Sequence, residues 1–237
     1  MTYNQTTIAV PRIGDGVYTV PDASRILNLP LPRVQRWVSG YTRLIENGVR
    51  KHKQGIVDEG IWGSGRDRGL NFFALIEVFT FATLRDLGVS SQEIRKARAE
   101  LASRFGTQYP FASHRLLSDG QQILVMLGTL EKSVLMILGE DGQTALREVV
   151  EPFCRKIDFC DATSLAVRFW PLGRDRAVVV DPHHSFGRPT IAETNIPTET
   201  ITQFIRAGES IKVVAQEFDI PESSVLDAVK FEQQVAA

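Results

Sequence analysis

Three polar side chains near the front of the chain are of the types that read DNA bases. They are Arg33, Gln35 and Arg36. In the major groove, arginine hydrogen-bonds the O6 and N7 atoms of guanine, and glutamine hydrogen-bonds the N6 and N7 atoms of adenine. Such side chains can read a sequence only when an element of structure holds them in the groove. The surrounding residues must therefore be searched for that element.

Residues 18–41 carry the signals of two short helices joined by a tight turn. Thr19 and Asp22 have the spacing of a capping box, and Asn28 can adopt the left-handed conformation that ends a helix. Pro32 suits the first turn of a second helix. The apolar residues that share one face of this second helix are Val34, Trp37 and Val38. The pattern predicts a helix-turn-helix, which commonly places its second helix in the major groove.

A glycine-containing segment over residues 50–70 follows this motif. Its apolar pair Ile61-Trp62 stands beside the turn Gly63-Ser64-Gly65, which predicts a β-wing whose cations could meet phosphates. A dinucleotide-binding loop is excluded, because these glycines do not lie between a core strand and a helix. The predicted DNA-binding residues are Arg33, Gln35, Arg36, Arg43, Lys51, Lys53, Arg66 and Arg68.

Two longer helices are expected behind the wing, over residues 71–87 and 91–105. The second has Ser90 as its cap and Glu93 in its first turn. The motifs that carry a resemblance are Tyr18-Thr19-Val20, Arg33-Val34-Gln35-Arg36-Trp37 and Leu84-x-x-Leu87-Gly88-Val89-Ser90-x-x-Glu93-Ile94. In this order they resemble the MerR-type winged helix-turn-helix over residues 16–105. The long dimerising helix and the metal-sensing cysteines of MerR regulators are missing, so a metal or drug sensor is not expected.

The back of the chain carries a second helix-turn-helix pattern over residues 210–230. The motifs before it are Val179-Val180-Asp181-Pro182, Gly187-Arg188-Pro189-Thr190-Ile191, Thr194-Asn195-Ile196-Pro197 and Ala207-Gly208-Glu209-Ser210. This series resembles domain-of-unknown-function family 433. Glu193 and Asn195 stand near the places where that family usually has a glycine and an arginine, which weakens a nucleic-acid role for this loop. The helices predict burial of Val213, Val214, Phe218, Val225, Leu226 and Val229, and exposure of Glu222, Ser223, Ser224, Asp227 and Lys230.

The charge distribution separates the two helix-turn-helix patterns. Residues 1–107 hold 15 lysines and arginines against 10 acidic residues, whereas residues 181–237 hold 4 against 9. Each phosphate contact needs a cation, so a net charge of −5 in the back segment opposes DNA binding there. We therefore expect the front pattern to bind DNA and the back pattern to bind protein.

The middle of the chain reads as a β-rich connector that docks the two ends and could dimerise. The predicted elements are a hairpin over residues 115–125, a strand over 134–138, a helix over 145–153 and strands over 165–170 and 177–180. The expected fold is α+β, with an N-terminal winged helix-turn-helix, a β-rich middle and a C-terminal helix-turn-helix-like unit. The corresponding domains are residues 1–107, 108–180 and 181–237.

The sequence gives little support for an enzyme, a cofactor or a metal site. His183 and His184 follow Asp181, but no further histidine or cysteine lies nearby, and Cys154 and Cys160 are read as buried small residues. No nucleophile elbow or phosphate loop is found. No run of about 18 apolar residues and no signal peptide is seen, so the expected location is the cytoplasm, without a membrane span.

The complete arrangement resembles VapB-type antitoxins of the kind encoded beside a PIN-like ribonuclease toxin. The resemblance implies a homodimer that neutralises the toxin by binding it and that represses its own operon by binding operator DNA. Two alternatives stay open. One is a ligand-responsive MerR-like transcriptional regulator, and the other is a protein-interaction module without DNA binding.

Overall fold

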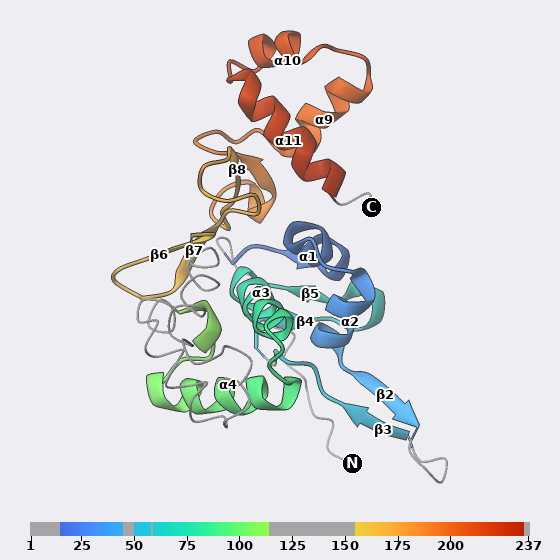
Figure 1. Ribbon diagram of the computed structural model, residues 1–237, viewed down its shortest axis with the longest axis vertical. Coiled ribbons are helices and arrows are strands. Elements are labelled where there is room, and N and C mark those ends of the chain that lie inside the picture. The colour runs from blue at the N-terminus through green and yellow to red at the C-terminus, as the bar shows by residue number, and fades with distance from the viewer. Residues whose placement is uncertain (1–14, 45–49, 58, 114–154, 235–237) are drawn as a thin grey trace.

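The computed structural model describes residues 15–44, 50–57, 59–113 and 155–234 (Figure 1). The elements of the front part are β1 (Tyr18–Thr19), α1 (Val20–Leu27), α2 (Leu31–Ser39), β2 (Tyr41–Leu44), β3 (Arg50–Lys53), β4 (Ile61–Trp62), η1 (Gly65–Asp67), β5 (Gly69–Leu70), α3 (Phe72–Asp86), α4 (Ser91–Phe105) and η2 (Pro110–Ala112). Those of the back part are β6 (Ile157–Phe159), β7 (Ala166–Phe169), β8 (Val178–Val180), η3 (Ser185–Gly187), β9 (Pro189–Ile191), α9 (Thr198–Arg206), α10 (Ile211–Glu217) and α11 (Glu222–Gln234).

The first helix-turn-helix forms with the predicted caps. The Thr19 hydroxyl accepts from the backbone N–H of Asp22, and the Asp22 carboxylate accepts from the N–H of Thr19, which is the reciprocal capping box. Asn28 ends α1 in the left-handed conformation, with φ 51°. The residues of α2 that were expected to face the core, Val34, Trp37 and Val38, are buried.

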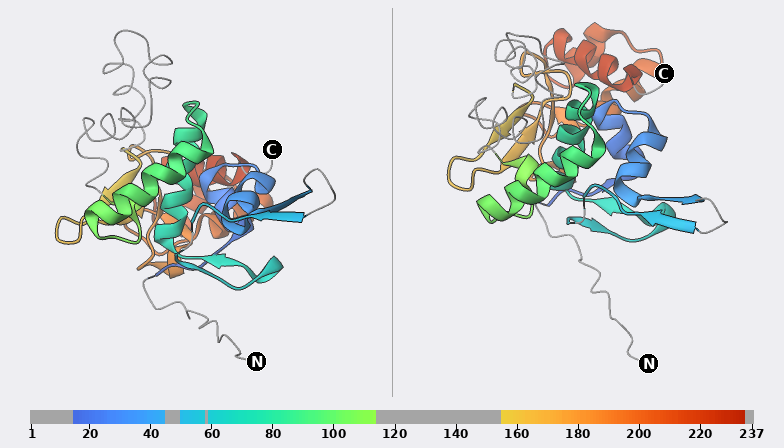
Figure 2. Two further views of the ribbon diagram at one scale, coloured as in Figure 1. Left: turned by 90° about the horizontal axis from the view of Figure 1, so that it is seen from below. Right: turned by 60° about the horizontal axis from the view of Figure 1, so that its bottom comes forward.

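The wing is larger than the sequence suggested. Its long hairpin pairs β2 with β3 and begins at Tyr41, directly after α2, whereas the prediction placed the whole wing after residue 50. A second, shorter pair joins β4 to β5, and β5 also pairs with β1 at the entrance to α1. The β2–β3 hairpin projects beyond the rest of the front part in both further views (Figure 2).

Helix α3 lies at the centre of the molecule and is buried on almost every side. The Trp37 ring of α2 meets Phe81 of α3 edge-on at 5.0 Å, and Phe79 of α3 meets Phe169 of β7 at 4.8 Å. Buried Glu77 accepts from Arg98 Nε of α4 and from the backbone N–H of Phe111. Burial raises the pKa of Glu77, against the opposing effect of Arg98. One continuous core therefore joins α1–α4 to the strands of the back part.

The back part begins with a four-stranded antiparallel sheet in the order β6-β7-β8-β9. The expected strands over residues 165–170 and 177–180 are confirmed as β7 and β8. The β8–β9 ladder pairs Val180 with Pro189, so it continues across the expected domain boundary after residue 180. The hairpin, strand and helix predicted over residues 115–125, 134–138 and 145–153 lie outside the described residues.

The C-terminal helices α9, α10 and α11 occupy the end of the long axis opposite α4 and the β2–β3 hairpin (Figure 1). Two of their expected burials are wrong, since Val213 is 46% exposed and Leu226 is 50% exposed. Conversely, Ser224 and Asp227 are buried, although both were expected on the surface. The Asp227 carboxylate accepts from Arg176 Nη1 and from the N–H of Ala177, and these bonds turn this face of α11 toward the sheet.

The predicted fold class is confirmed: the protein is α+β, with a winged helix-turn-helix in front and a helix-turn-helix-like unit behind. Among the described residues, the helices are all too short or too polar to cross a membrane.

Candidate nucleic-acid interface

The exposed face of α2 is the best candidate for base contacts. Gln35 and Arg36 are both exposed, while the opposite face of the helix packs into the core. The Arg36 guanidinium carbon lies 5.7 Å from the centre of the Tyr41 ring. This cation–π contact holds Arg36 toward the start of the wing, so Tyr41 helps to position a predicted base-reading residue. Tyr41 was not among the predicted DNA-binding residues, and its position just after α2 was the available signal.

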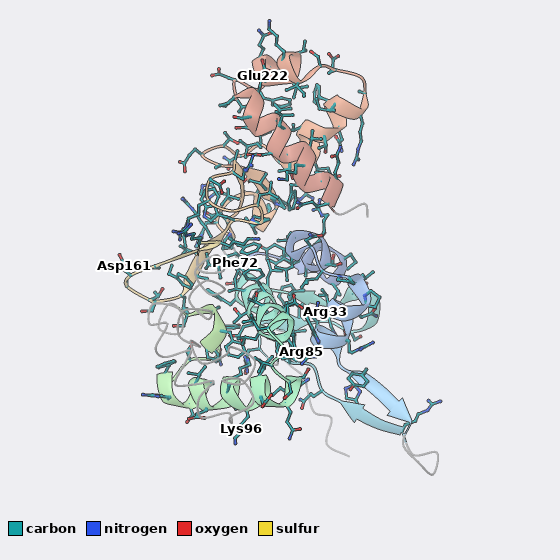
Figure 3. All side chains as sticks on the ribbon, in the orientation of Figure 1. Arg33, Phe72, Arg85, Lys96, Asp161 and Glu222 are labelled. Carbon is teal, nitrogen blue, oxygen red and sulfur yellow. The ribbon has the colours of Figure 1, made fainter. Side chains whose placement is uncertain are left out.

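Arg33 occupies a different face of α2. Its Nη2 atom lies 2.5 Å from Asp86 Oδ1 at the end of α3, and its guanidinium carbon lies 4.6 Å from the Trp37 ring centre. Figure 3 shows Arg33 on the side of α2 that is turned toward α3. The arginine is therefore already paired within the chain, and a DNA phosphate or base would have to compete with Asp86 for it.

A backbone hydrogen bond to α2 and side-chain hydrogen bonds from α4 fix the segment after β3. The N–H of Ile56 donates to the Trp37 carbonyl at 2.7 Å, which places the chain after β3 beside the last turn of the helix. A Cβ on Gly55 would lie 2.7 Å from that same carbonyl oxygen, so a larger residue does not fit without a shift. Arg95 of α4 donates to the carbonyls of Gly55 and Gln54. The hairpin and α2 are thus held at one relative position.

Arg68 contributes to the same junction. Its Nη1 atom donates to the Val38 carbonyl at 3.2 Å. A cation at the end of a helix satisfies an unpaired carbonyl and complements the helix dipole. In this arrangement Arg68 supports the end of α2, and its assignment to phosphate binding stays a prediction.

The remaining predicted cations lie on the wing. Arg43 of β2 pairs in register with Lys51 of β3, and Lys53 pairs with Tyr41. Arg66 lies in η1, between β4 and β5. These four residues therefore lie in the wing, and their contact with phosphates stays a prediction.

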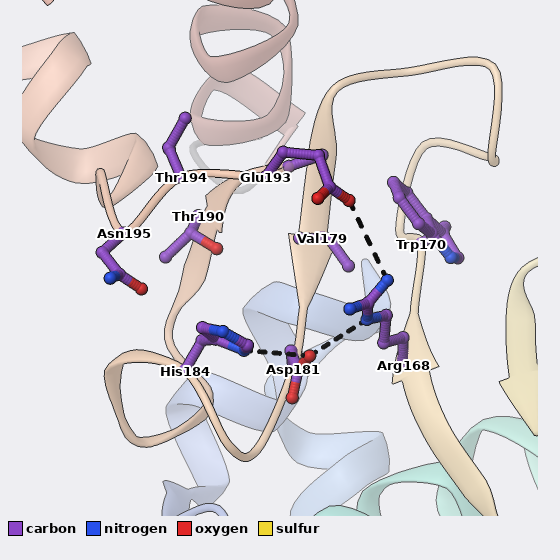
Figure 4. A pocket seen from close by; sticks show the side chains of 10 residues that line it. Arg168, Trp170, Val179, Asp181, His184, Thr190, Glu193, Thr194 and Asn195 are labelled. Atoms are coloured by element: carbon purple, nitrogen blue, oxygen red, sulfur yellow. Dashed lines mark hydrogen bonds and ion pairs between the residues drawn. The ribbon is translucent and has the colours of Figure 1, made fainter. Parts of the chain in front are cut away.

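A small pocket of about 150 Å³ lies in the back part, over β7, β8 and β9. Asp181 is its buried centre, with Arg168 Nε at 3.0 Å and His184 Nδ1 at 3.1 Å (Figure 4). Burial opposes ionisation here, but hydrogen bonds from His183 N–H, Arg168 and His184 outweigh it and lower the pKa of Asp181 below its ordinary value. Glu193 has a left-handed backbone, with φ 60°, and its Oε1 atom lies 4.0 Å from Arg168 Nη1.

The Asp181 carboxylate at the centre of the pocket is already paired with Arg168 and His184. In the described part of the chain, histidine, cysteine, aspartate and glutamate nowhere gather into a group of three that could hold a metal ion. Cys160 is half-buried and free, which differs from the expected full burial, and Cys154 lies outside the described residues.

Two segments of the chain match known families. Residues 16–98 match the model described as a "Putative DNA-binding HTH domain", and residues 178–231 match a "Protein of unknown function (DUF433)". The fold and the comparisons together define a two-part protein, whose front segment matches the first family and whose back segment matches the second.

Two proteins of Mycobacterium tuberculosis (strain ATCC 25618 / H37Rv) are similar along nearly their whole length. One is named "Putative antitoxin VapB45", which is 26% identical over 221 residues, covering 90% of this chain and 92% of that protein. The other is "Uncharacterized protein Rv2308", which is 24% identical over 233 residues, covering 91% and 89% respectively. The crystal structure of Rv2018 from Mycobacterium tuberculosis has the same fold, with a TM-score of 0.68, 23% identity and coverage of 90% of this chain and 96% of that one.

Proposed function

We propose that this protein is the antitoxin of a toxin–antitoxin pair, and that it also represses its own operon by binding operator DNA. The similarity to a protein named as an antitoxin and the match to a DNA-binding helix-turn-helix family support this function. Its partners are operator DNA, a PIN-like ribonuclease toxin and a second copy of the chain. It has no catalytic role of its own and acts in the cytoplasm.

The exposed pair Gln35 and Arg36, held beside a basic hairpin, is the observation that carries the DNA-binding part. Both are residue types that form bidentate bonds to base edges. The front segment, residues 1–107, also has a net charge of +5, which favours a polyanion. One reading helix covers one half-site, so a homodimer would read two half-sites related by two-fold symmetry.

The C-terminal segment, residues 181–237, is the proposed toxin-binding part. Its net charge is −5, so a polyanion is a poor partner for it. Several large apolar side chains are exposed there: Phe186 at 71%, Phe204 at 39%, Val213 at 46% and Leu226 at 50%. Aromatic and aliphatic groups of this kind are the usual anchors of protein interfaces. The segment between, residues 108–180, is the proposed connector and dimerisation region.

The test of DNA binding uses the full chain and a duplex from the region upstream of its own gene, with affinity measured by fluorescence anisotropy. The double variant Gln35→Ala/Arg36→Ala should bind at least tenfold more weakly, because each bidentate contact contributes about 1–3 kcal/mol. The matched control is Arg206→Ala/Gln216→Ala, which removes the same two residue types from exposed positions of α9 and α10. Equal losses in both variants would contradict the assignment to α2. If no duplex is bound in a salt-dependent way, the remaining interpretation is a protein-interaction module without DNA binding.

The test of the antitoxin role uses co-expression with the product of the adjacent gene. The two proteins should co-purify, and the complex should lack the ribonuclease activity that the neighbour shows alone. The antitoxin role is overturned if the neighbouring protein does not co-purify with this protein, or if it stays fully active in its presence. Neither result affects the proposal of DNA binding.

A further inference from the structure

Leu31, the first residue of α2, is an exposed leucine on the proposed reading helix. Its side chain is 43% exposed, whereas Val34, Trp37 and Val38 of the same helix are at most 8% exposed. Pro32 beside it is also exposed. The proposed reading helix, α2, therefore begins with a partly exposed apolar surface.

Leu31 shares a face of α2 with Gln35. Residues four apart on a helix lie on one face, one turn from each other. Both side chains are exposed, so they form one surface of a leucine followed by a glutamine. In helix-turn-helix proteins, the N-terminal residues of the second helix are those that contact base edges.

Arg33 does not compete for this surface. Its guanidinium is paired with Asp86 and lies over the Trp37 ring, on the side of α2 that faces α3. Arg36 is drawn toward Tyr41 and the wing. The start of the helix thus presents Leu31 and Gln35 to the groove without an arginine between them.

The major groove offers such a leucine one apolar partner, the 5-methyl group of thymine. Gln35 in turn is suited to the N6 and N7 atoms of adenine. We propose that Leu31 packs on a thymine methyl group, and that Leu31 and Gln35 together make A·T pairs a required part of each half-site. The proposal rests on the DNA-binding function and names the bases that this function reads.

The experiment removes single methyl groups from the DNA. The full chain first selects its preferred duplexes from a random double-stranded pool. Each thymine of a selected duplex is then replaced by deoxyuridine, which keeps base pairing and lacks only the 5-methyl group. At one thymine per half-site, the wild-type protein should lose roughly fourfold in affinity, as expected for one buried methyl group.

The protein variants identify the side chain that senses the methyl group. Leu31→Ala should bind the thymine duplex more weakly and should no longer distinguish it from the deoxyuridine duplex at that position. Leu31→Met should keep the distinction, because it also presents an apolar side chain. Val17→Ala, which shortens an exposed apolar side chain that lies before β1 and is 47% exposed, should behave as the wild type.

Two negative results have different meanings. The role of Leu31 alone is overturned if the wild type binds every deoxyuridine form as tightly as the thymine duplex. The same holds if Leu31→Ala keeps the wild-type distinction between the two duplexes. Failure to select any sequence overturns both this role and the DNA-binding function. Thermal melting of each variant checks that it is folded, which an exposed position should permit.

Discussion

At the scale of single residues, the pairing of Arg33 with Asp86 separates two arginines that have similar places in the sequence. Arg33 and Arg36 lie on the same helix, three residues apart, yet one is paired within the chain and the other points to the wing. The ion pair itself is partly exposed, with side-chain exposures of 33% and 60%. Such pairs contribute little to stability, so the main effect of Asp86 is to restrict the positions that the Arg33 side chain can reach.

Removing the charge of Asp86 should strengthen DNA binding. In Asp86→Asn, one repulsive charge is lost and the Arg33 guanidinium becomes free to reach a phosphate. We expect a twofold to fivefold gain in affinity at low salt. We also expect the logarithm of the affinity to fall more steeply with the logarithm of the salt concentration, because about one more counterion is released from the DNA. Fluorescence anisotropy over a range of salt concentrations measures both quantities.

The matched control for this change is Asp161→Asn. Asp161 is an exposed carboxylate between β6 and β7, far from Arg33 in Figure 3. A weaker affinity in Asp86→Asn than in the control would mean that Asp86 holds Arg33 in its DNA-binding position, contrary to this expectation.

At the scale of elements, the sequence predicted those whose signals are local. Capping residues such as Thr19 and Ser90 mark where α1 and α4 begin, because the cap and its partner lie within four residues. The long hairpin was only partly predicted, since β2 lacks the alternation that marks a half-buried strand. The rotation of α11 was missed, because Asp227 is buried by partners 50 and 51 residues away. For the same reason, no local pattern could show that Arg33 would meet Asp86, which is 53 residues away.

At the scale of the whole molecule, the front part and the C-terminal part are joined by a largely buried ion pair. Arg25 Nη1 of α1 lies 3.0 and 3.2 Å from the two carboxylate oxygens of Glu232 in α11, and Thr198 of α9 donates to the same carboxylate at 2.6 Å. Phe231 belongs to the same core as the residues of α1–α4. Direct contacts therefore set the position of the first helix-turn-helix relative to α9 and α11, which belong to the proposed toxin-binding part.

Replacing this carboxylate should destabilise the protein. In Glu232→Gln, the Arg25 charge loses its partner in a largely buried place, which should lower the free energy of unfolding by on the order of 2 kcal/mol. Urea denaturation measures the change. Glu222→Gln is the matched control, because Glu222 lies exposed at the start of the same helix and should change stability little. A Glu232→Gln variant as stable as the control would show that the ion pair does not hold the two parts together.

We propose that the first helix-turn-helix meets DNA and that the second does not. A photoreactive amino acid placed at position 35 of α2 or at position 216 of α10 tests it directly, because both positions are exposed glutamines in the natural chain. On irradiation with an operator duplex, we predict a covalent protein–DNA product from position 35 and none from position 216. A product from position 216, or none from position 35, would contradict this proposal.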